Sequence, residues 1–166
     1  MTTAAVPAIR SEDSVLTRLL RTTLLIGVID GLWAVVLTFI YGRPIAGLFP
    51  GIAATLFGER MATGGTAAQV VGVLMHFGVA FTWTAVFLLF FLRSAWIRRV
   101  LDSPYGVLKV AAVYGPMIWI VMSAVVIPLL LRRPLAISGR WWIQLAGHVV
   151  FVGMPIVWGI AKSSRH

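Results

Sequence analysis

The chain contains no cysteine among its 166 residues, and few of its residues carry charge. Without cysteine it has neither a disulfide framework nor a thiolate metal site. Charged residues make up 11% of the sequence, whereas a soluble domain carries about 25%. This scarcity excludes a water-soluble globule and a disordered chain. Apolar residues are abundant, at 60% with a mean hydropathy of +0.96, which is typical of an integral membrane protein.

Four apolar runs are each long enough to cross about 30 Å of hydrocarbon, which takes about 20 helical residues. Backbone polar groups must be satisfied internally in lipid, so each run should be helical. The predicted fold class is therefore all-α, an integral membrane four-helix bundle. We predict spans at residues 22–41, 67–92, 105–131 and 141–161.

The distribution of basic residues predicts the orientation of the bundle. Eight Lys and Arg lie before the first span, between the second and third, and after the fourth, and Lys109 near the start of the third span makes nine, against five in the other two connections. Because cytoplasmic loops are enriched in Lys and Arg, both termini should be cytoplasmic, in a bacterial inner membrane. Residues 1–14 then form a flexible cytoplasmic leader, residues 15–162 a single four-helix domain, and residues 163–166 a cytoplasmic tail.

The net charge of +9 does not indicate a nucleic-acid partner. The basic residues are scattered between apolar runs, whereas a nucleic-acid interface gathers them on one face. The expected partner is the lipid bilayer, together with further copies of the chain or a larger membrane complex.

Residues 44–58 form an unusually long and apolar connection. The segment is too short and too rich in Gly and Pro to cross the membrane. Ile45, Leu48, Phe49 and Ile52 nevertheless recur near helical spacing. We expect a broken helix that caps the bundle and is either interfacial or re-entrant on the periplasmic side.

Ionisable residues inside the predicted spans are the candidate functional residues: Asp30, His76 and His148. Such residues cost about 2.5–3.5 kcal/mol on insertion scales and often mark functional sites. At 1.5 Å per residue they lie about 16, 14 and 10 Å below the periplasmic boundary, and Met122 reaches the same level. Gln144 shares a helix face with His148. We therefore predict one buried polar layer of Asp30, His76, Met122, His148 and Gln144.

This layer leaves several functions open. In a non-enzymatic accessory subunit or homo-oligomer it would be a hydrogen-bonded knot or a proton-responsive site. In a membrane redox protein, His76 and His148 would bind haem b or, with Asp30, a metal. A small ion-coupled transporter is a further alternative. A lipid-processing enzyme is supported only by the apolar segment, and no nucleophile elbow or phosphate-binding loop is present, so the balance is against an enzyme.

The order of short motifs also resembles that of a known family. Asp30 in the first span is followed by a Gly-Arg-Pro exit at residues 42–44 and by His76 in the second span. Tyr114 precedes Gly115 in the third span, and Gly147 precedes His148 in the fourth. This order resembles a widespread group of small bacterial four-helix inner-membrane proteins, distantly similar to YagU. The resemblance implies a four-helix membrane bundle and no established reaction.

Overall fold

The computed structural model describes residues 14–132 and 134–162, and every regular element in this part of the chain is a helix. The predicted all-α fold class is confirmed for these residues. The predicted leader and tail, apart from Ser14, lie outside them.

Four helical stretches are long and apolar enough to cross a membrane, and three of them start and end within two residues of the predicted spans. The first stretch begins seven residues before its predicted span, at a helix end capped by Ser14, whose Oγ accepts a hydrogen bond from the Thr17 N–H at 3.1 Å. The four stretches are Val15–Ile40, Gly65–Phe91, Gly106–Leu131 and Gly139–Ala161.

A π-helical turn interrupts or ends three of these four stretches. Two of the turns lie just before Pro128 and Pro155. Proline lacks an N–H and its ring clashes with the carbonyl four residues earlier, so the helix accommodates it with a wider turn.

The four long stretches consist of the following elements: α1 (Val15–Ile40); α3 (Gly65–Val86) with η3 (Phe87–Phe91); α5 (Gly106–Val121), η4 (Met122–Val126) and α6 (Ile127–Leu131); and α7 (Gly139–His148), η5 (Val149–Gly153) and α8 (Met154–Lys162).

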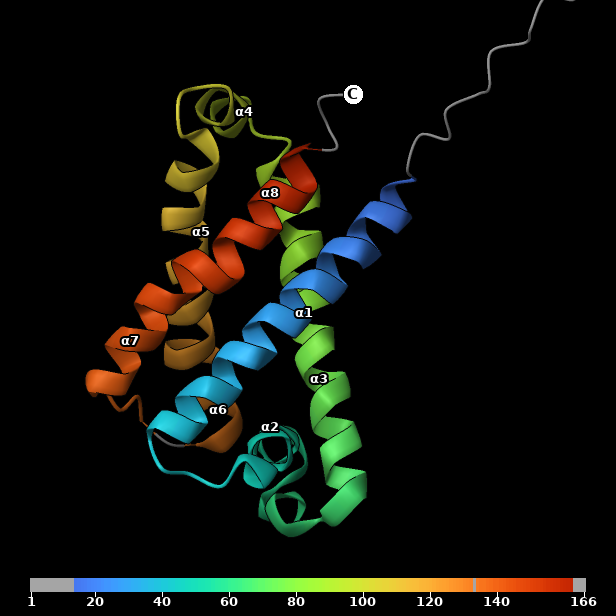
Figure 1. The fold of residues 1–166 in the computed structure, drawn as a ribbon, viewed down its shortest axis with the longest axis vertical. Coiled ribbons are helices and arrows are strands. Elements are labelled where there is room, and N and C mark those ends of the chain that lie inside the picture. Colours follow the sequence, from blue (N-terminus) through green and yellow to red (C-terminus); the bar gives the residue numbers. More distant parts are fainter. Residues whose placement is uncertain (1–13, 133, 163–166) are drawn as a thin grey trace, which may run out of the picture.

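Both described chain ends lie at the same end of the bundle. The start of α1 and the end of α8 are found there with the short helix α4 (Ala95–Leu101), whereas α2 and α6 lie at the opposite end (Figure 1). α1 packs between α3 and α8, and α5 packs against α7, η5 and α8. The short helix α4 was not predicted from the sequence. Its Ile97 and Leu101 side chains are buried, and it also carries Arg98 and Arg99.

The apolar segment forms the predicted broken helix and folds back against α3. Gly58, with φ of 86°, ends its main helix. Gly72 lies against the Phe49 backbone, where a Cβ atom would collide. The rings of Phe49 and His76 are 6.0 Å apart, so the segment reaches the level of a predicted site residue. Its elements are η1 (Ile45–Gly47) and α2 (Leu48–Phe57), and η2 (Glu59–Thr63) connects it to α3.

The largest buried side chains gather in the half of the bundle nearer α4. Phe87, Tyr114, Ile156 and Ile160 are each at most 1% exposed. The Tyr114 hydroxyl donates a hydrogen bond to the Trp83 carbonyl at 2.6 Å, so its polar group is satisfied within the apolar core.

Candidate functional site

His76 ties α3 to α1. Its Nε2 lies 2.8 Å from the Gly27 carbonyl oxygen and therefore donates a hydrogen bond to it. Gly31, one turn further along α1, leaves room for the imidazole, since a Cβ atom there would lie 3.4 Å from Nε2. The Phe77 ring packs edge-on against His76, at 5.6 Å between centroids. These contacts occupy the ring nitrogen that His76 would otherwise offer to a haem iron.

Gln144 and Trp33 join α7 to α1. The Trp33 Nε1–H donates to Gln144 Oε1 at 3.0 Å. The indole lies over Gly147, where any Cβ atom would collide with it, and stacks on Phe151 at 4.5 Å between centroids. Because Trp33 lies one helical turn from Asp30, this contact places the Asp30 side of α1 next to α7.

His148 lies in a largely buried position where α7 meets α5, and it is 8% exposed. Gly115 of α5 allows this close approach, because a Cβ atom there would collide with the His148 backbone. The imidazole Nδ1 donates to the Gln144 carbonyl at 2.8 Å, and the ring lies 4.9 Å from that of Trp119. Nε2 makes no hydrogen bond within the described residues, so it is available to take up a proton.

Asp30 lies on α1, one helical turn from Trp33, whose hydrogen bond to Gln144 joins α1 to α7. Its side chain is partly buried, and its carboxylate makes no hydrogen bond within the described residues. Asp30 is therefore the carboxylate on the face of α1 that is next to α7, the helix that carries His148.

The predicted polar layer thus divides into two parts. His76 contacts α1 and the apolar segment, whereas Asp30, Gln144 and His148 gather where α1, α5 and α7 meet. Met122 packs against the apolar core. In residues 14–132 and 134–162, no three His, Asp or Glu side chains lie close enough together to hold a metal ion. The geometry therefore gives no support to a metal site made of both histidines and Asp30.

Sequence reasoning missed an aromatic cluster beside His148. The Trp141 Nε1–H donates to Ser123 Oγ at 3.0 Å, and the Trp141 ring lies 6.3 Å from that of Trp119. The Trp119 Nε1 is buried with no hydrogen-bond partner among the described residues. The spacing of residues 119 and 123, one helical turn apart, was the available signal, but it does not reveal that Trp141 packs against them.

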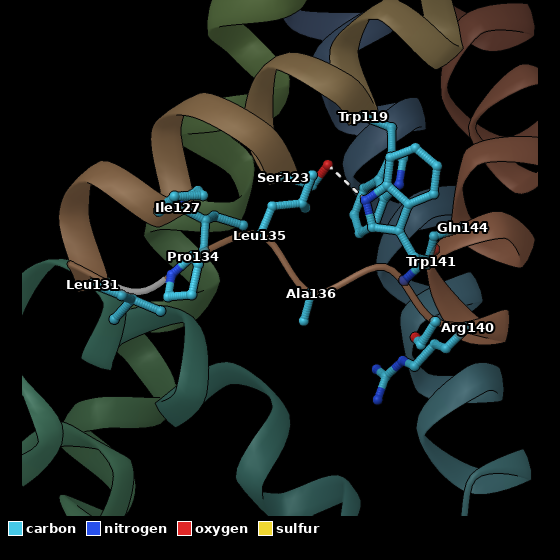
Figure 2. Close-up of a pocket in the computed structure, with 12 residues that line it drawn as sticks. Trp119, Ser123, Ile127, Leu131, Pro134, Leu135, Ala136, Arg140, Trp141 and Gln144 are labelled. Carbon is cyan, nitrogen blue, oxygen red and sulfur yellow. Dashed lines mark hydrogen bonds between the residues drawn. The ribbon is translucent and has the colours of Figure 1, made fainter.

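A cavity of about 380 Å³ lies beside this cluster, between α5, α6 and α7 (Figure 2). Its polar lining includes Ser123, Gln144 and Arg140, and aliphatic side chains such as Ile127, together with the Trp141 ring, form further parts of its wall. Trp119 also lines the cavity. Gln144 and Trp119 are thus at once part of the cavity wall and in contact with His148.

Comparison of the chain with protein-family models, curated proteins and solved structures finds no match. The resemblance to YagU-like proteins therefore stays a prediction. Function is inferred from the arrangement of Asp30, His148 and the adjoining cavity.

Proposed function

We propose that the chain is a non-enzymatic, multi-pass membrane protein that responds to protonation of His148. The observation that carries this proposal is the setting of His148, which is 8% exposed, donates through Nδ1 to the Gln144 carbonyl at 2.8 Å and lies 4.9 Å from the Trp119 ring. Asp30, on the side of α1 that lies next to α7, is the carboxylate that we propose as its charged partner. Histidine is the side chain whose charge ordinarily changes between pH 5 and 8. A proton on His148 would also place a cation 4.9 Å from the Trp119 ring, within the range of a cation–π interaction.

His76 has a structural role in this proposal. Its hydrogen bond to Gly27 joins two helices through a backbone carbonyl, which carries no titratable charge. The two histidines differ in their partners although both lie within apolar helices. His76 therefore serves as the matched control for His148.

A bacterial inner membrane with cytoplasmic termini is the proposed location. Four apolar helices of spanning length support insertion in a bilayer. The end that carries α4 and both described chain ends has the larger share of basic residues, which supports a cytoplasmic position for that end. Those residues are Arg18, Arg21, Arg93, Arg98, Arg99 and Lys109, against Arg43, Arg60, Arg132 and Arg140 at the other end.

Lipid, and further copies of the chain or another membrane subunit, are the proposed partners. All four long helices expose large apolar side chains, for example Leu32, Leu74, Val113 and Val150, which are 60%, 67%, 68% and 56% exposed. A bilayer covers such a surface, and helices of a second protein can pack against part of it.

The contact between Trp119 and His148 provides an optical test, because a protonated imidazole quenches the fluorescence of an adjacent indole. We expect the tryptophan fluorescence of the detergent-purified protein to change in a step as the pH is lowered. The step should be lost in His148→Gln and in Trp119→Phe. In Asp30→Asn it should move to lower pH, because the carboxylate that favours the imidazolium is gone.

His76→Gln is the matched control and should keep the step at its wild-type position. A step that persists unchanged in His148→Gln would show that His148 is not the responding group. An unchanged midpoint in Asp30→Asn would show that the carboxylate does not act on it.

A further inference from the structure

The cavity is lined by polar side chains that belong to otherwise apolar helices. Ser123 and Gln144 belong to helices of spanning length, yet both line the cavity. Arg140 also lines it, and its guanidinium group lies 5.4 Å above the Tyr41 ring. A volume of about 380 Å³ holds about 13 water molecules at about 30 Å³ each, and these polar groups can hydrogen-bond to them.

The route from His148 toward the opposite end of the bundle is closed by apolar side chains. Val152, Ile156 and Ile160 follow His148 at intervals of one helical turn and are 3%, 0% and 0% exposed. They belong to the same buried cluster as Phe87, which is 0% exposed. Close-packed aliphatic and aromatic side chains leave no space for a chain of water molecules.

Trp119 stands between the cavity and the His148 ring. It lines the cavity and lies 4.9 Å from the imidazole. Its buried Nε1–H has no acceptor among the described residues, which is unfavourable for a buried polar group. Rotation of the indole toward the cavity would bring Nε1 to water and uncover the imidazole.

We infer that the cavity is a water-filled vestibule through which protons reach His148 from one end of the bundle only, with Trp119 as its inner gate. This inference rests on the proposed role of His148. With the termini in the cytoplasm, the vestibule opens on the periplasmic side, so the protein senses periplasmic pH.

Single cysteines test this inference cleanly because the chain has none of its own. Ser123→Cys and Ile127→Cys place a thiol in the cavity, Ile156→Cys places one in the closed half, and Val150→Cys places one on the exposed outer surface. Each variant is reconstituted in phosphatidylcholine vesicles and treated with a charged, membrane-impermeant thiosulfonate from either side, or with a lipid-soluble maleimide.

The charged reagent should modify both cavity cysteines, from the side of α2 and α6 alone. It should leave Ile156→Cys unmodified, and Val150→Cys should react only with the maleimide. Modification of the cavity cysteines by the maleimide alone would show that the cavity holds lipid chains. Modification by neither reagent, or by the charged reagent from the side of α4, would also overturn the inference.

The proposed gating role of Trp119 is tested by the rate at which a cysteine at position 148 reacts. His148→Cys should react with the charged reagent severalfold faster when Trp119 is replaced by Ala, and an unchanged rate would contradict the gating role.

Labelling does not depend on the titration of His148, so the two proposals fail separately. If Ser123→Cys is labelled but the fluorescence step does not require His148, the vestibule stands and the proposed function is wrong. If the step requires His148 but both cavity cysteines stay unlabelled, the vestibule is wrong and the proposed function stands.

Discussion

The two histidines of the long helices differ in their nearest polar neighbours. The Nε2 of His76 donates to a backbone carbonyl of α1, which fixes the position of the ring. The Nδ1 of His148 donates to a carbonyl of its own helix, and we propose that its Nε2 takes up the proton. Residue type and depth alone therefore do not distinguish the two histidines. The hydrogen-bond partner of each ring nitrogen distinguishes them.

The hydrogen bond between Trp33 and Gln144 should make a measurable contribution to stability. Trp33→Phe keeps most of the aromatic surface over Gly147 but removes the donor, leaving the Gln144 Oε1 without it. We expect the free energy of unfolding to fall by about 1 kcal/mol, measured by denaturation in mixed detergent micelles. Trp96→Phe is the matched control, because Trp96 is 66% exposed on α4, and a loss of equal size there would contradict this account.

At the scale of elements, Gly72 decides whether the apolar segment can pack on α3. A Cβ atom at Gly72 would collide with the backbone of Phe49, whereas one at Gly78 of the same helix meets nothing within 4 Å. Gly72→Ala should lower the free energy of unfolding by about 1–3 kcal/mol through overpacking. It should also speed proteolysis within residues 44–58.

Gly78→Ala should have little effect on stability, or increase it slightly, because alanine favours the helix more than glycine does. Equal destabilisation by the two substitutions would show that helix propensity, and not the contact with Phe49, sets the effect.

The long helices could be predicted from the sequence because length and hydropathy nearly determine a helix of spanning length. The short helix α4 could not, since its seven residues are too few to span a membrane and two of them are arginines. Depth along each helix also follows from a fixed rise per residue, which is why Asp30, His76 and His148 could be singled out. Rotation about the helix axis depends on contacts such as Trp33 with Gln144, 111 positions apart. For that reason the division of the histidines between two environments was not predictable.

At the scale of the whole molecule, the bundle has two unlike halves. The half near α4 has an apolar core that includes Phe87 and Ile160, and beyond this core lies a cavity of about 390 Å³ lined by residues such as Arg93 and Asp102. The half near α2 and α6 contains the cavity beside Trp119. The proposal places proton access to His148 on the side of α2 and α6, because the apolar core separates His148 from the cavity near α4.

The orientation of the whole molecule can be tested in cells. Both described chain ends lie at the α4 end of the bundle (Figure 1), and the larger share of basic residues lies there too. A green fluorescent protein that matures only in the cytoplasm should therefore fluoresce when fused to either terminus. Alkaline phosphatase, active only in the periplasm, should be active when inserted near Ala136. Activity of a phosphatase fused at a terminus would reverse the orientation and the side to which the vestibule opens.

The central claim is that Asp30 and His148 form one proton-responsive pair, and direct titration of the His148 ring tests it most closely. Nitrogen NMR of histidine-labelled protein in micelles would follow both ring nitrogens, with His148→Gln identifying the resonances. We predict that in Asp30→Asn the titration of His148 moves to lower pH, while in His76→Gln it stays at the wild-type midpoint. A His148 ring that keeps one protonation state from pH 4 to 9, or that titrates identically in Asp30→Asn and wild type, would contradict the account.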